Sequence, residues 1–289
     1  MDSDAQGLDM RWLRVDCLMI DRDQYKKTGF LLVRNFIDPD ELDTVRNEAR
    51  KIFMMQLKRN NLIDSFDISE TEFETSLYAL FRKDLQQIIY CGKQAQHLIS
   101  LHRLSLNEQI LNALKELGIE FPVINVRPTI FFNSPYLGKS DVDWKKPSHQ
   151  DWRTTQGSLD SIVVWVPLID IDKSLGALEI VPESHKLGLL NYEMQNNYHT
   201  IVDDAARQLP FVSVEVTKGD ALFFSTFLIH RSGENTSNSI RWSCHFRYNN
   251  LCEPTFIQRG FPHSYIYKPQ DELITPGFPS AQDVYEAFE

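Results

Sequence analysis

The first residues that could do chemistry are a histidine and an aspartate two positions apart, His149 and Asp151. On an extended strand, residues at i and i+2 project from the same face, so the imidazole and the carboxylate would point the same way. A second imidazole would complete a facial set of two histidines and one carboxylate, which binds non-haem Fe(II) and leaves coordination positions open. Because His-x-Asp arises often by chance, a solvated aspartate beside a hydrogen-bonded histidine is the plainer interpretation until other residues are considered.

A second candidate ligand, His230, lies where a later strand is expected to end. It follows the apolar run 221–227 and precedes a turn rich in Gly, Asn and Ser. If the flanking strands pair around a loop centred near Asn235 and Thr236, residue 230 lies opposite Arg241. A guanidinium beside an open metal site is suited to binding a carboxylate with two hydrogen bonds. Taken singly, the histidine could be structural and the arginine could form a surface ion pair.

Short strands must position these residues. From about residue 121 onward, apolar runs recur between turns without alternating helices, which is typical of an antiparallel double-sheet barrel of the jelly-roll, cupin-like class, a double-stranded β-helix. The expected strands are 123–132, the segment of His149, 161–168, 176–182, 212–216, 221–227 and 241–248.

The last expected strand carries several polar side chains on one face. Arg241, His245 and Arg247 alternate and would therefore point into the barrel, while the residues between them face a helical layer. We expect His245 and Arg247 to fill the far end of the barrel rather than to contact a substrate.

The first part of the chain, residues 20–120, is expected to form a strand and this helical layer. Gly29 before a branched apolar run predicts a turn into a buried strand. Asp38 as N-cap and Pro39 at the first helical position predict a helix start, and residues 56–120 carry apolar residues at helical spacing. We expect one domain over residues 1–289, made of the layer 20–120, the jelly-roll core 121–250 and a C-terminal tail, 251–289, on the surface.

Composition limits the classes of partner. The 289 residues include 40 acidic and 30 basic ones, a net charge of −10, which argues against a nucleic-acid partner. A small anionic ligand on one or two buried arginines stays compatible with this charge. Four cysteines without metal-ligand spacing indicate a reducing compartment. No membrane-length apolar run and no signal peptide are visible, so we expect a cytoplasmic protein without a membrane partner; the sequence leaves a homo-oligomer open.

Together these motifs resemble the phytanoyl-CoA dioxygenase family of Fe(II)- and 2-oxoglutarate-dependent oxygenases. The likeness covers roughly residues 20–50 and 125–250. The segments that carry it are Gly29–Phe36, Pro147–Asp151, Gly176–His185, and His230 with Ser232 and, eleven positions after that histidine, Arg241. One residue departs from the family pattern, because Glu183 stands where Gly is usual.

The resemblance implies a metal centre and a cosubstrate site. His149, Asp151 and His230 would ligate Fe(II). Arg241, assisted by Ser232, would bind the distal carboxylate of 2-oxoglutarate. With O2, such an enzyme converts 2-oxoglutarate to succinate and CO2 and hydroxylates, or otherwise oxidises at C–H, a small-molecule substrate. Related halogenases have a small residue in place of the metal-binding carboxylate, so Asp151 favours a hydroxylase.

Other residues fall where family members often line the cosubstrate and substrate pockets. Gln150, Thr129 and Trp165 would line the cosubstrate pocket. Trp152 and Arg153, which follow the aspartate directly, are substrate-binding candidates.

Two further function classes stay open: a non-oxidative cupin-like metal isomerase or lyase, and a non-catalytic jelly-roll binding protein. Nothing in the chain resembles the His-x-His plus Glu set of many cupins, and an intact ligand set weighs against a decayed site. We expect His185 to be structural, and Lys145 and Lys146 to be plain loop charges.

Overall fold

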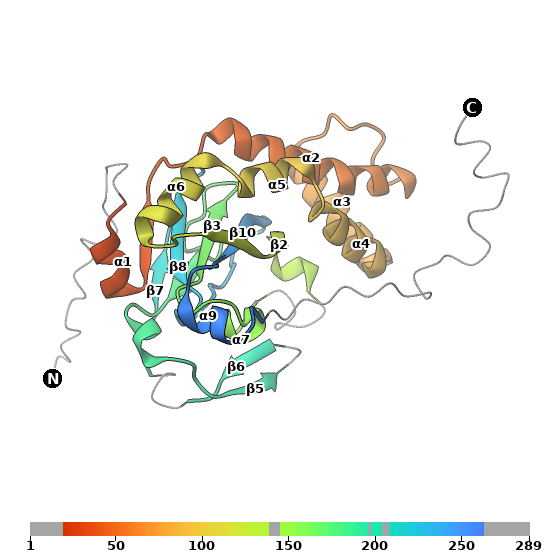
Figure 1. Cartoon of the computed structure of the whole chain (residues 1–289). Coiled ribbons are helices and arrows are strands. Elements are labelled where there is room, and N and C mark those ends of the chain that lie inside the picture. The colour runs from red at the N-terminus through yellow and green to blue at the C-terminus, as the bar shows by residue number, and fades with distance from the viewer. Residues whose placement is uncertain (1–19, 139–144, 196–197, 204–207, 263–289) are drawn as a thin grey trace, which may run out of the picture.

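The structure is a computed structural model that describes residues 20–138, 145–195, 198–203 and 208–262 (Figure 1). Its α-helices are α1 (Arg22–Thr28), α2 (Pro39–Arg59), α3 (Glu70–Lys83), α4 (Leu85–Ala95), α5 (Ile99–Ser105), α6 (Glu108–Leu117), α7 (Trp152–Thr155) and α9 (Pro254–Gln258). Two 3-10 helices are η2 (Pro135–Leu137) and η3 (Ser184–Leu187). Its strands are β1 (Phe30–Val33), β2 (Pro122–Asn133), β3 (Ile162–Pro167), β4 (Leu178–Ile180), β5 (Tyr192–Gln195), β6 (Tyr198–Ile201), β7 (Val212–Val214), β8 (Ala221–Ser225), β9 (His230–Ser232) and β10 (Arg241–Asn250).

Two antiparallel sheets form the core that was expected. The larger sheet has the order β1-β8-β3-β10-β2, and the smaller one the order β7-β4-β9. Strand β10 pairs with both β2 and β3. Its register with β2 shifts on either side of Arg247, an irregularity that locally bends and twists a strand pair. The result is the jelly roll predicted from the sequence.

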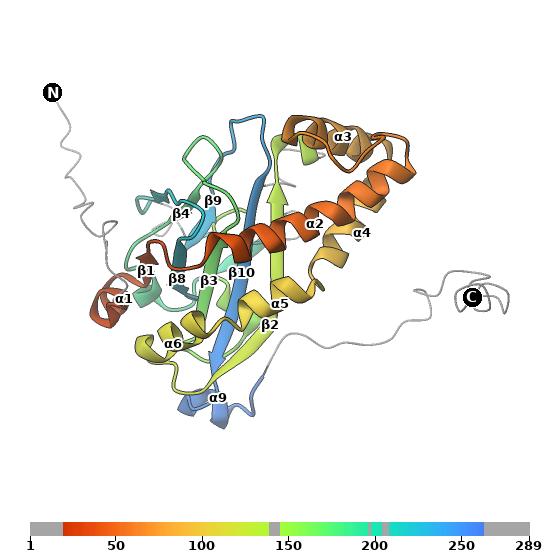
Figure 2. The same cartoon turned by 90° about the horizontal axis from the view of Figure 1, so that it is seen from above.

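The helical layer packs on one face of the larger sheet, with α2 lying across the strands (Figures 1 and 2). Helix α2 begins as predicted: the Asp38 carboxylate accepts a hydrogen bond from the Asp40 backbone N–H at 3.0 Å, and Pro39 lies in the first turn. On its buried face, Phe53 meets the Trp242 ring edge-on at 6.1 Å between centroids. Packing against the sheet, more than helix propensity, therefore holds this helix in place.

Side chains alternate between the two faces of the larger sheet, as the period of a strand requires. Trp242 and Phe246 of β10 join the helix-facing core, and Trp165 of β3 joins the core between the sheets. Arg241 and His245 line a cavity on the inner side. The predicted orientation of β10 is thus confirmed.

The strand expected around His149 is not formed. This residue makes a single antiparallel bridge to His230, and Asp151 has helical backbone angles (φ −67°, ψ −31°) at the start of α7. The i, i+2 geometry proposed for the two ligands is therefore wrong. The chain turns away after one bridge because the Trp152 N–H donates to the Thr226 carbonyl (3.0 Å), which draws the segment towards the turn after β8.

The predicted pairing of residue 230 with residue 241 is also wrong. Strand β9 pairs with β4 in the smaller sheet, whereas β10 lies in the larger one. The intervening turn does not close a hairpin, because the Gly233 N–H donates to the Ala177 carbonyl (3.1 Å) and ties the turn to the end of β4. Arg241 consequently approaches His230 from the opposite sheet.

Two segments carry structure that the sequence did not indicate. Helix α1 precedes the predicted turn at Gly29, which has φ 83°. A hairpin, β5–β6, lies within the long loop expected after residue 182. Of the expected surface tail, 251–289, only the part up to residue 262, with α9, belongs to the described residues.

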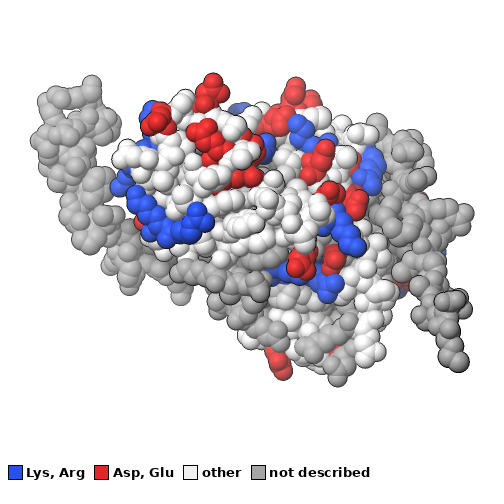
Figure 3. All heavy atoms as spheres, turned by 180° about the vertical axis from the view of Figure 1, so that it is seen from behind, with Lys and Arg blue, Asp and Glu red and all other residues white. Residues whose placement is uncertain are grey.

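None of the helices in the described part of the chain has the length and apolarity needed to cross a bilayer. On the face drawn in Figure 3, acidic and basic side chains lie interspersed.

Candidate metal centre

Two histidines are placed side by side by a backbone bridge. The His149 N–H donates to the His230 carbonyl at 3.0 Å, and the His230 N–H donates back at 3.1 Å. Directly opposed residues of an antiparallel bridge project to the same side. The ring centroids accordingly lie 4.2 Å apart.

Each imidazole is fixed by a backbone carbonyl two residues earlier. The Nδ1 atom of His149 lies 2.7 Å from the Pro147 oxygen, and that of His230 lies 3.0 Å from the Leu228 oxygen. A carbonyl oxygen only accepts, so each Nδ1 must carry the proton and each Nε2 keeps a free lone pair. Burial, followed by repulsion from the neighbouring His149, lowers the pKa of His230 to about 3, which keeps this ring neutral.

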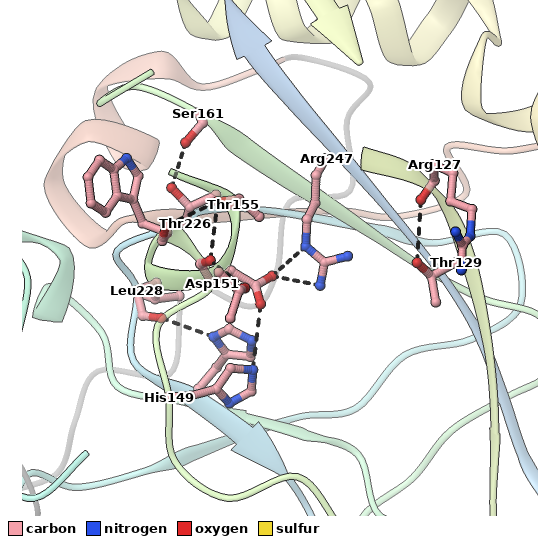
Figure 4. A network of polar contacts seen from close by, with 12 residues as sticks. Arg127, Thr129, His149, Asp151, Thr155, Ser161, Thr226, Leu228 and Arg247 are labelled. Carbon is pink, nitrogen blue, oxygen red and sulfur yellow. Dashed lines mark hydrogen bonds and ion pairs between the residues drawn. The ribbon is translucent and has the colours of Figure 1, made fainter. Parts of the chain in front are cut away.

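The third candidate ligand, Asp151, is held by an arginine from the larger sheet. Both Nε and Nη2 of Arg247 lie 2.8 Å from Oδ2 of the carboxylate, while Oδ1 faces His149 Nε2 at 3.6 Å (Figure 4). Burial alone would raise the pKa of Asp151, but attraction to the Arg247 guanidinium brings it well below its usual value. The carboxylate is therefore ionised and turned so that one oxygen stays free.

Ligand atoms of His149, Asp151 and His230 all lie within 4.8 Å of one another. Metal bonds to imidazole and carboxylate are about 2 Å long, so three such atoms can converge on one ion with small adjustments. Two neutral imidazoles and one carboxylate are the donor set of non-haem Fe(II) sites. The set fits an Fe(II) ion with several positions left for other ligands.

The candidate ligands border two adjoining cavities. The larger, about 430 Å³, extends to α3 and α4, where Ile88 and Ile89 line it. The smaller, about 310 Å³, extends towards α7, where Thr154 and Thr155 line it. The residues common to both walls are Gln96, Thr129, Phe131, Lys146, His149 and Arg247.

Arg241 lines the larger cavity as a buried cation without a carboxylate partner in the described part of the chain. One guanidinium nitrogen donates to the Gly176 carbonyl, and Nη2 lies 3.5 Å from the Ser232 hydroxyl. Nε has no hydrogen-bond partner among the described residues. A buried charge of this kind requires a counter-ion, so the guanidinium fits a ligand carboxylate.

The other residues expected at the cosubstrate site lie in different settings. Thr129 lines both cavities. Trp165 is fully buried between the sheets, and its indole N–H has no partner in the described residues. The Gln150 amide bonds to the backbone. Its nitrogen donates to the Gly188 and Phe227 carbonyls, both at 2.7 Å, and its oxygen accepts from the Leu190 N–H at 2.9 Å. These bonds fix a loop, and the cosubstrate role of Gln150 stays a prediction without support from its contacts.

The two substrate candidates, Trp152 and Arg153, do not line either cavity. The indole of Trp152 stacks on Phe227 at 5.3 Å between centroids. Arg153 donates to the Leu190 carbonyl at 2.6 Å and lies over the Tyr192 ring at 4.1 Å. Trp152 thus packs on the turn after β8 and Arg153 on the start of β5, so the expectation that they contact a substrate receives no support.

Arg247 and Lys146 were misjudged from the sequence. Arg247 points inward as expected, but it binds the metal-site carboxylate instead of filling the far end of the barrel. The sequence offered one indication that Arg247 reaches the site: it lies two residues after His245, on the same inward face of the strand. Lys146 is no plain loop charge, because it lines both cavities with its Nζ 4.3 Å from the centroid of Phe131. The expected structural role of His185 agrees with its hydrogen bond to the Lys26 carbonyl (3.1 Å).

Comparison with known proteins gives one family. The model of the phytanoyl-CoA dioxygenase (PhyH) family matches residues 25–243. A probable phytanoyl-CoA dioxygenase of Caenorhabditis elegans is 26% identical over 249 residues, covering 79% of this chain and 74% of that protein. The peroxisomal phytanoyl-CoA dioxygenase of Homo sapiens is 26% identical over 233 residues, covering 77% of this chain and 66% of that protein.

Solved structures share the fold at low identity. The epimerase SnoN in complex with Fe3+, alpha ketoglutarate and nogalamycin RO has a TM-score of 0.56 at 16% identity, covering 79% of this chain and 82% of its own. EctD from S. alaskensis, with 2-oxoglutarate and 5-hydroxyectoine, has a TM-score of 0.53 at 15% identity, covering 83% and 79%. These neighbours support the jelly-roll architecture described above.

Proposed function

The chain belongs to the phytanoyl-CoA dioxygenase family, and on that premise we propose that it is an Fe(II)- and 2-oxoglutarate-dependent dioxygenase that hydroxylates a small-molecule substrate. One observation carries the proposal. His149, Asp151 and His230 converge where two cavities adjoin, and the larger cavity is also lined by Arg241, whose guanidinium has no carboxylate partner among the described residues. A binding protein would have no need for this combination of an open metal site and a carboxylate clamp.

In this proposal His149 and His230 would hold Fe(II) through Nε2, and Asp151 would hold it through Oδ1. Such a centre would supply the oxidation of a C–H bond, with 2-oxoglutarate and O2 as cosubstrates and succinate and CO2 as coproducts. The backbone carbonyls behind the two imidazoles orient them and keep their Nδ1 protonated.

Arg241 holds the distal carboxylate of 2-oxoglutarate in this scheme, with the Ser232 hydroxyl beside it. Thr129 has a hydroxyl on the shared wall and is a candidate for a further contact with the cosubstrate. Trp165, whose indole N–H has no partner among the described residues, lines neither cavity, so its cosubstrate role stays a prediction. The apolar core between the sheets excludes water behind the site, which strengthens the ionic contacts within it.

The metal-binding carboxylate is present, so a halide has no vacated ligand position at this centre, and hydroxylation is the favoured outcome. SnoN is an epimerase, so the shared fold accommodates other outcomes. Phytanoyl-CoA, which the curated relatives are named for, is the first compound to test. A cytoplasmic location stays a prediction, because the human relative is named as peroxisomal.

The test is optical and anaerobic. Purified protein with Fe(II) and 2-oxoglutarate should develop a weak visible metal-to-ligand charge-transfer band. The band should be absent in His230→Ala, which lacks a metal ligand. In Arg241→Met it should require about 10–100-fold more 2-oxoglutarate, since a charge-assisted contact contributes about 1.5–3 kcal/mol.

The aerobic half of the test measures succinate by mass spectrometry with and without candidate substrates. Arg231→Met is the matched control, because Arg231 also lines the larger cavity but is already paired with Glu179 at 2.5 Å. A wild-type protein that binds Fe(II) without giving the band would indicate the isomerase or lyase alternative. A protein that binds no metal would indicate the non-catalytic one.

A further inference from the structure

The walls of the two cavities carry more positive than negative charge. Asp151 is the only acidic side chain among the described residues that line them. Arg247 already neutralises this carboxylate through two contacts of 2.8 Å. Of the basic groups close to the metal site, Arg241 is assigned to the cosubstrate in the proposed function. Of the other lining cations, Arg231 is paired with Glu179 at 2.5 Å, Arg127 donates to Gln96 at 2.9 Å, and Lys93 is an exposed residue of α4. The remaining lining cation is Lys146, which has no assigned ligand.

Lys146 lies half-buried where the two cavities adjoin. Its Nζ lies over the Phe131 ring at 4.3 Å, and this ring also packs against His245 at 4.5 Å. Within the described residues, Lys146 has no carboxylate in ion-pair contact. Its charge is therefore only partly stabilised, by the face of an aromatic ring. The adjacent lysine is different, since Lys145 points to Glu234 at 3.5 Å.

The part of the larger cavity formed by α3 and α4 is largely apolar, with Lys93 and Gln96 as its polar residues. Phe81 of α3 and Leu85, Ile88 and Ile89 of α4 line the larger cavity at the end that faces the helical layer. A cavity of about 430 Å³ lies at the lower end of the range for small-molecule sites, roughly 300–1,000 Å³. Such a site suits a compact ligand with one charged end and one apolar end.

We propose that Lys146 is a substrate-binding residue, and that the enzyme acts on a small amphiphilic acid whose carboxylate binds Lys146 and whose apolar part lies against α3 and α4. This inference rests on the proposed function for the identity of the site. It assigns the remaining cation to the substrate and the apolar helix wall to the same molecule. Burial, and secondarily repulsion from Arg247, lowers the pKa of Lys146 to about 8, so the ammonium form that binds an acid is still present at neutral pH.

The experiment compares three probes of equal chain length: decanoate, 1-decanol and decylamine. Each is titrated calorimetrically into the full-length protein loaded anaerobically with Fe(II) and 2-oxoglutarate. Decanoate should bind about tenfold or more tightly than decanol, because a hydrogen bond to a charged group contributes about 1.5–3 kcal/mol. Decylamine, positively charged at neutral pH, should bind most weakly.

Variants assign the preference to one side chain. Lys146→Met should bring decanoate and decanol to within about twofold of each other, and Lys146→Arg should keep the preference. Lys146→Glu should reverse the order in favour of decylamine. Lys145→Met is the matched control and should behave as the wild-type protein, because that lysine pairs with Glu234 away from the cavity walls.

Three results would overturn the inference. The first is equal affinity for decanoate, decanol and decylamine in the wild-type protein. The second is a preference for decanoate that persists in Lys146→Met. The third is a loss of 2-oxoglutarate affinity in Lys146→Met comparable to that in Arg241→Met, which would make the lysine part of the cosubstrate site. The charge-retaining Lys146→Arg variant keeps the test valid if the methionine variant fails to fold.

The same titrations on metal-free protein separate this inference from the proposed function. Loss of the charge-transfer band would contradict the iron- and 2-oxoglutarate-dependent chemistry. A preference for decanoate that depends on Lys146 would still be measurable without iron, because the cation and the apolar wall belong to the protein.

Discussion

Arg247 reaches Asp151 from the opposite sheet, and this contact determines which carboxylate oxygen can face a metal. The fork of Nε and Nη2 engages Oδ2, so only Oδ1 is directed to the histidines. A buried ion pair of this type has a large desolvation cost, and removing one partner leaves an uncompensated charge. We therefore treat Arg247 as a positioning residue that acts through the carboxylate.

Replacing Arg247 with Met should weaken metal binding by about 10–100-fold, the usual effect of losing the partner of a metal ligand. It should also raise the pKa of Asp151, because burial would then act without the attraction that lowers it. A proton would compete with the metal at higher pH than in the wild-type protein, so Co(II) affinity should decline earlier on acidification. Titration of the Co(II) visible spectrum at several pH values measures both effects.

Arg247→Lys is the informative comparison, since it retains the charge without the two-nitrogen fork. In Arg247→Lys, the decline of Co(II) affinity on acidification should stay close to that of the wild-type protein, whereas the Co(II) affinity itself should fall. If Arg247→Met kept the Co(II) affinity and the pH profile of the wild-type protein, the arginine would contribute packing alone.

A second pH effect follows from Lys146, whose folded-state pKa is lowered to about 8 from the usual 10.5 by burial and then by Arg247 and Arg241, with Asp151 acting in the opposite direction. Between these two values the unfolded chain holds the proton and the folded protein does not, so the free energy of unfolding rises with pH. Urea denaturation of metal-free protein should show this gain from about pH 8 upward, and Lys146→Met should lack it. Parallel profiles for the two proteins would contradict the prediction.

The secondary elements were predictable where the pattern is local. The N-cap at Asp38 and the alternation along β10 follow from neighbouring residues, and both are found. The identity of the candidate ligands was also readable, because it rests on residue types in known motifs. The strand pairing was predicted wrongly. The turn after β9 resembled that of a hairpin, but backbone hydrogen bonds to the end of β4 place β9 in the other sheet.

Contacts between distant segments could not be derived from local pattern. Arg247 meets Asp151 across 96 positions of the chain, and nothing near either residue signals the contact. The short bridge at His149 is likewise decided by its partner, His230, and not by its own sequence.

The turn before η3 explains a departure from the family pattern. Glu183 has φ 64°, in the left-handed region where Gly is favoured. Its carboxylate pairs with Lys186 at 2.8 Å, but both side chains are about half exposed, so the pair contributes little. Glu183→Gly should remove about 1 kcal/mol of strain, partly offset by the greater entropy of the unfolded chain.

Differential scanning calorimetry should therefore find Glu183→Gly more stable by up to about 1 kcal/mol, with a melting temperature higher by about 1–4 °C. Glu183→Gln keeps the backbone conformation and loses the ion pair, so it should show no gain. A glycine variant less stable than the glutamine variant would rule out relief of strain.

The metal centre joins the two sheets of the molecule. His230 belongs to the smaller sheet, and Asp151 is attached through Arg247 to the larger one (Figure 4). An ion bound to both should oppose separation of the sheets and so stabilise the folded state by mass action. At 100 times the dissociation constant this gives about 2.7 kcal/mol, or roughly 5–10 °C in melting temperature.

Thermal unfolding with Co(II), and again after EDTA, measures this difference. His230→Ala should show the same melting temperature in both conditions, since it lacks a ligand. A metal-induced shift of equal size in His230→Ala would mean that the ion binds elsewhere.

The double backbone bond between His149 and His230 has a consequence for evolution and engineering. The two imidazoles project from one hydrogen-bonded pair of backbone segments. Substitutions in the surrounding loops can therefore reshape the cavity while leaving the spacing of the imidazoles intact. The carboxylate is not fixed by this backbone pair. Its orientation depends on an arginine of β10, a strand that is distant in the sequence. Attempts to re-target this scaffold to new chemistry should therefore diversify the loops freely but leave the middle of β10 unchanged.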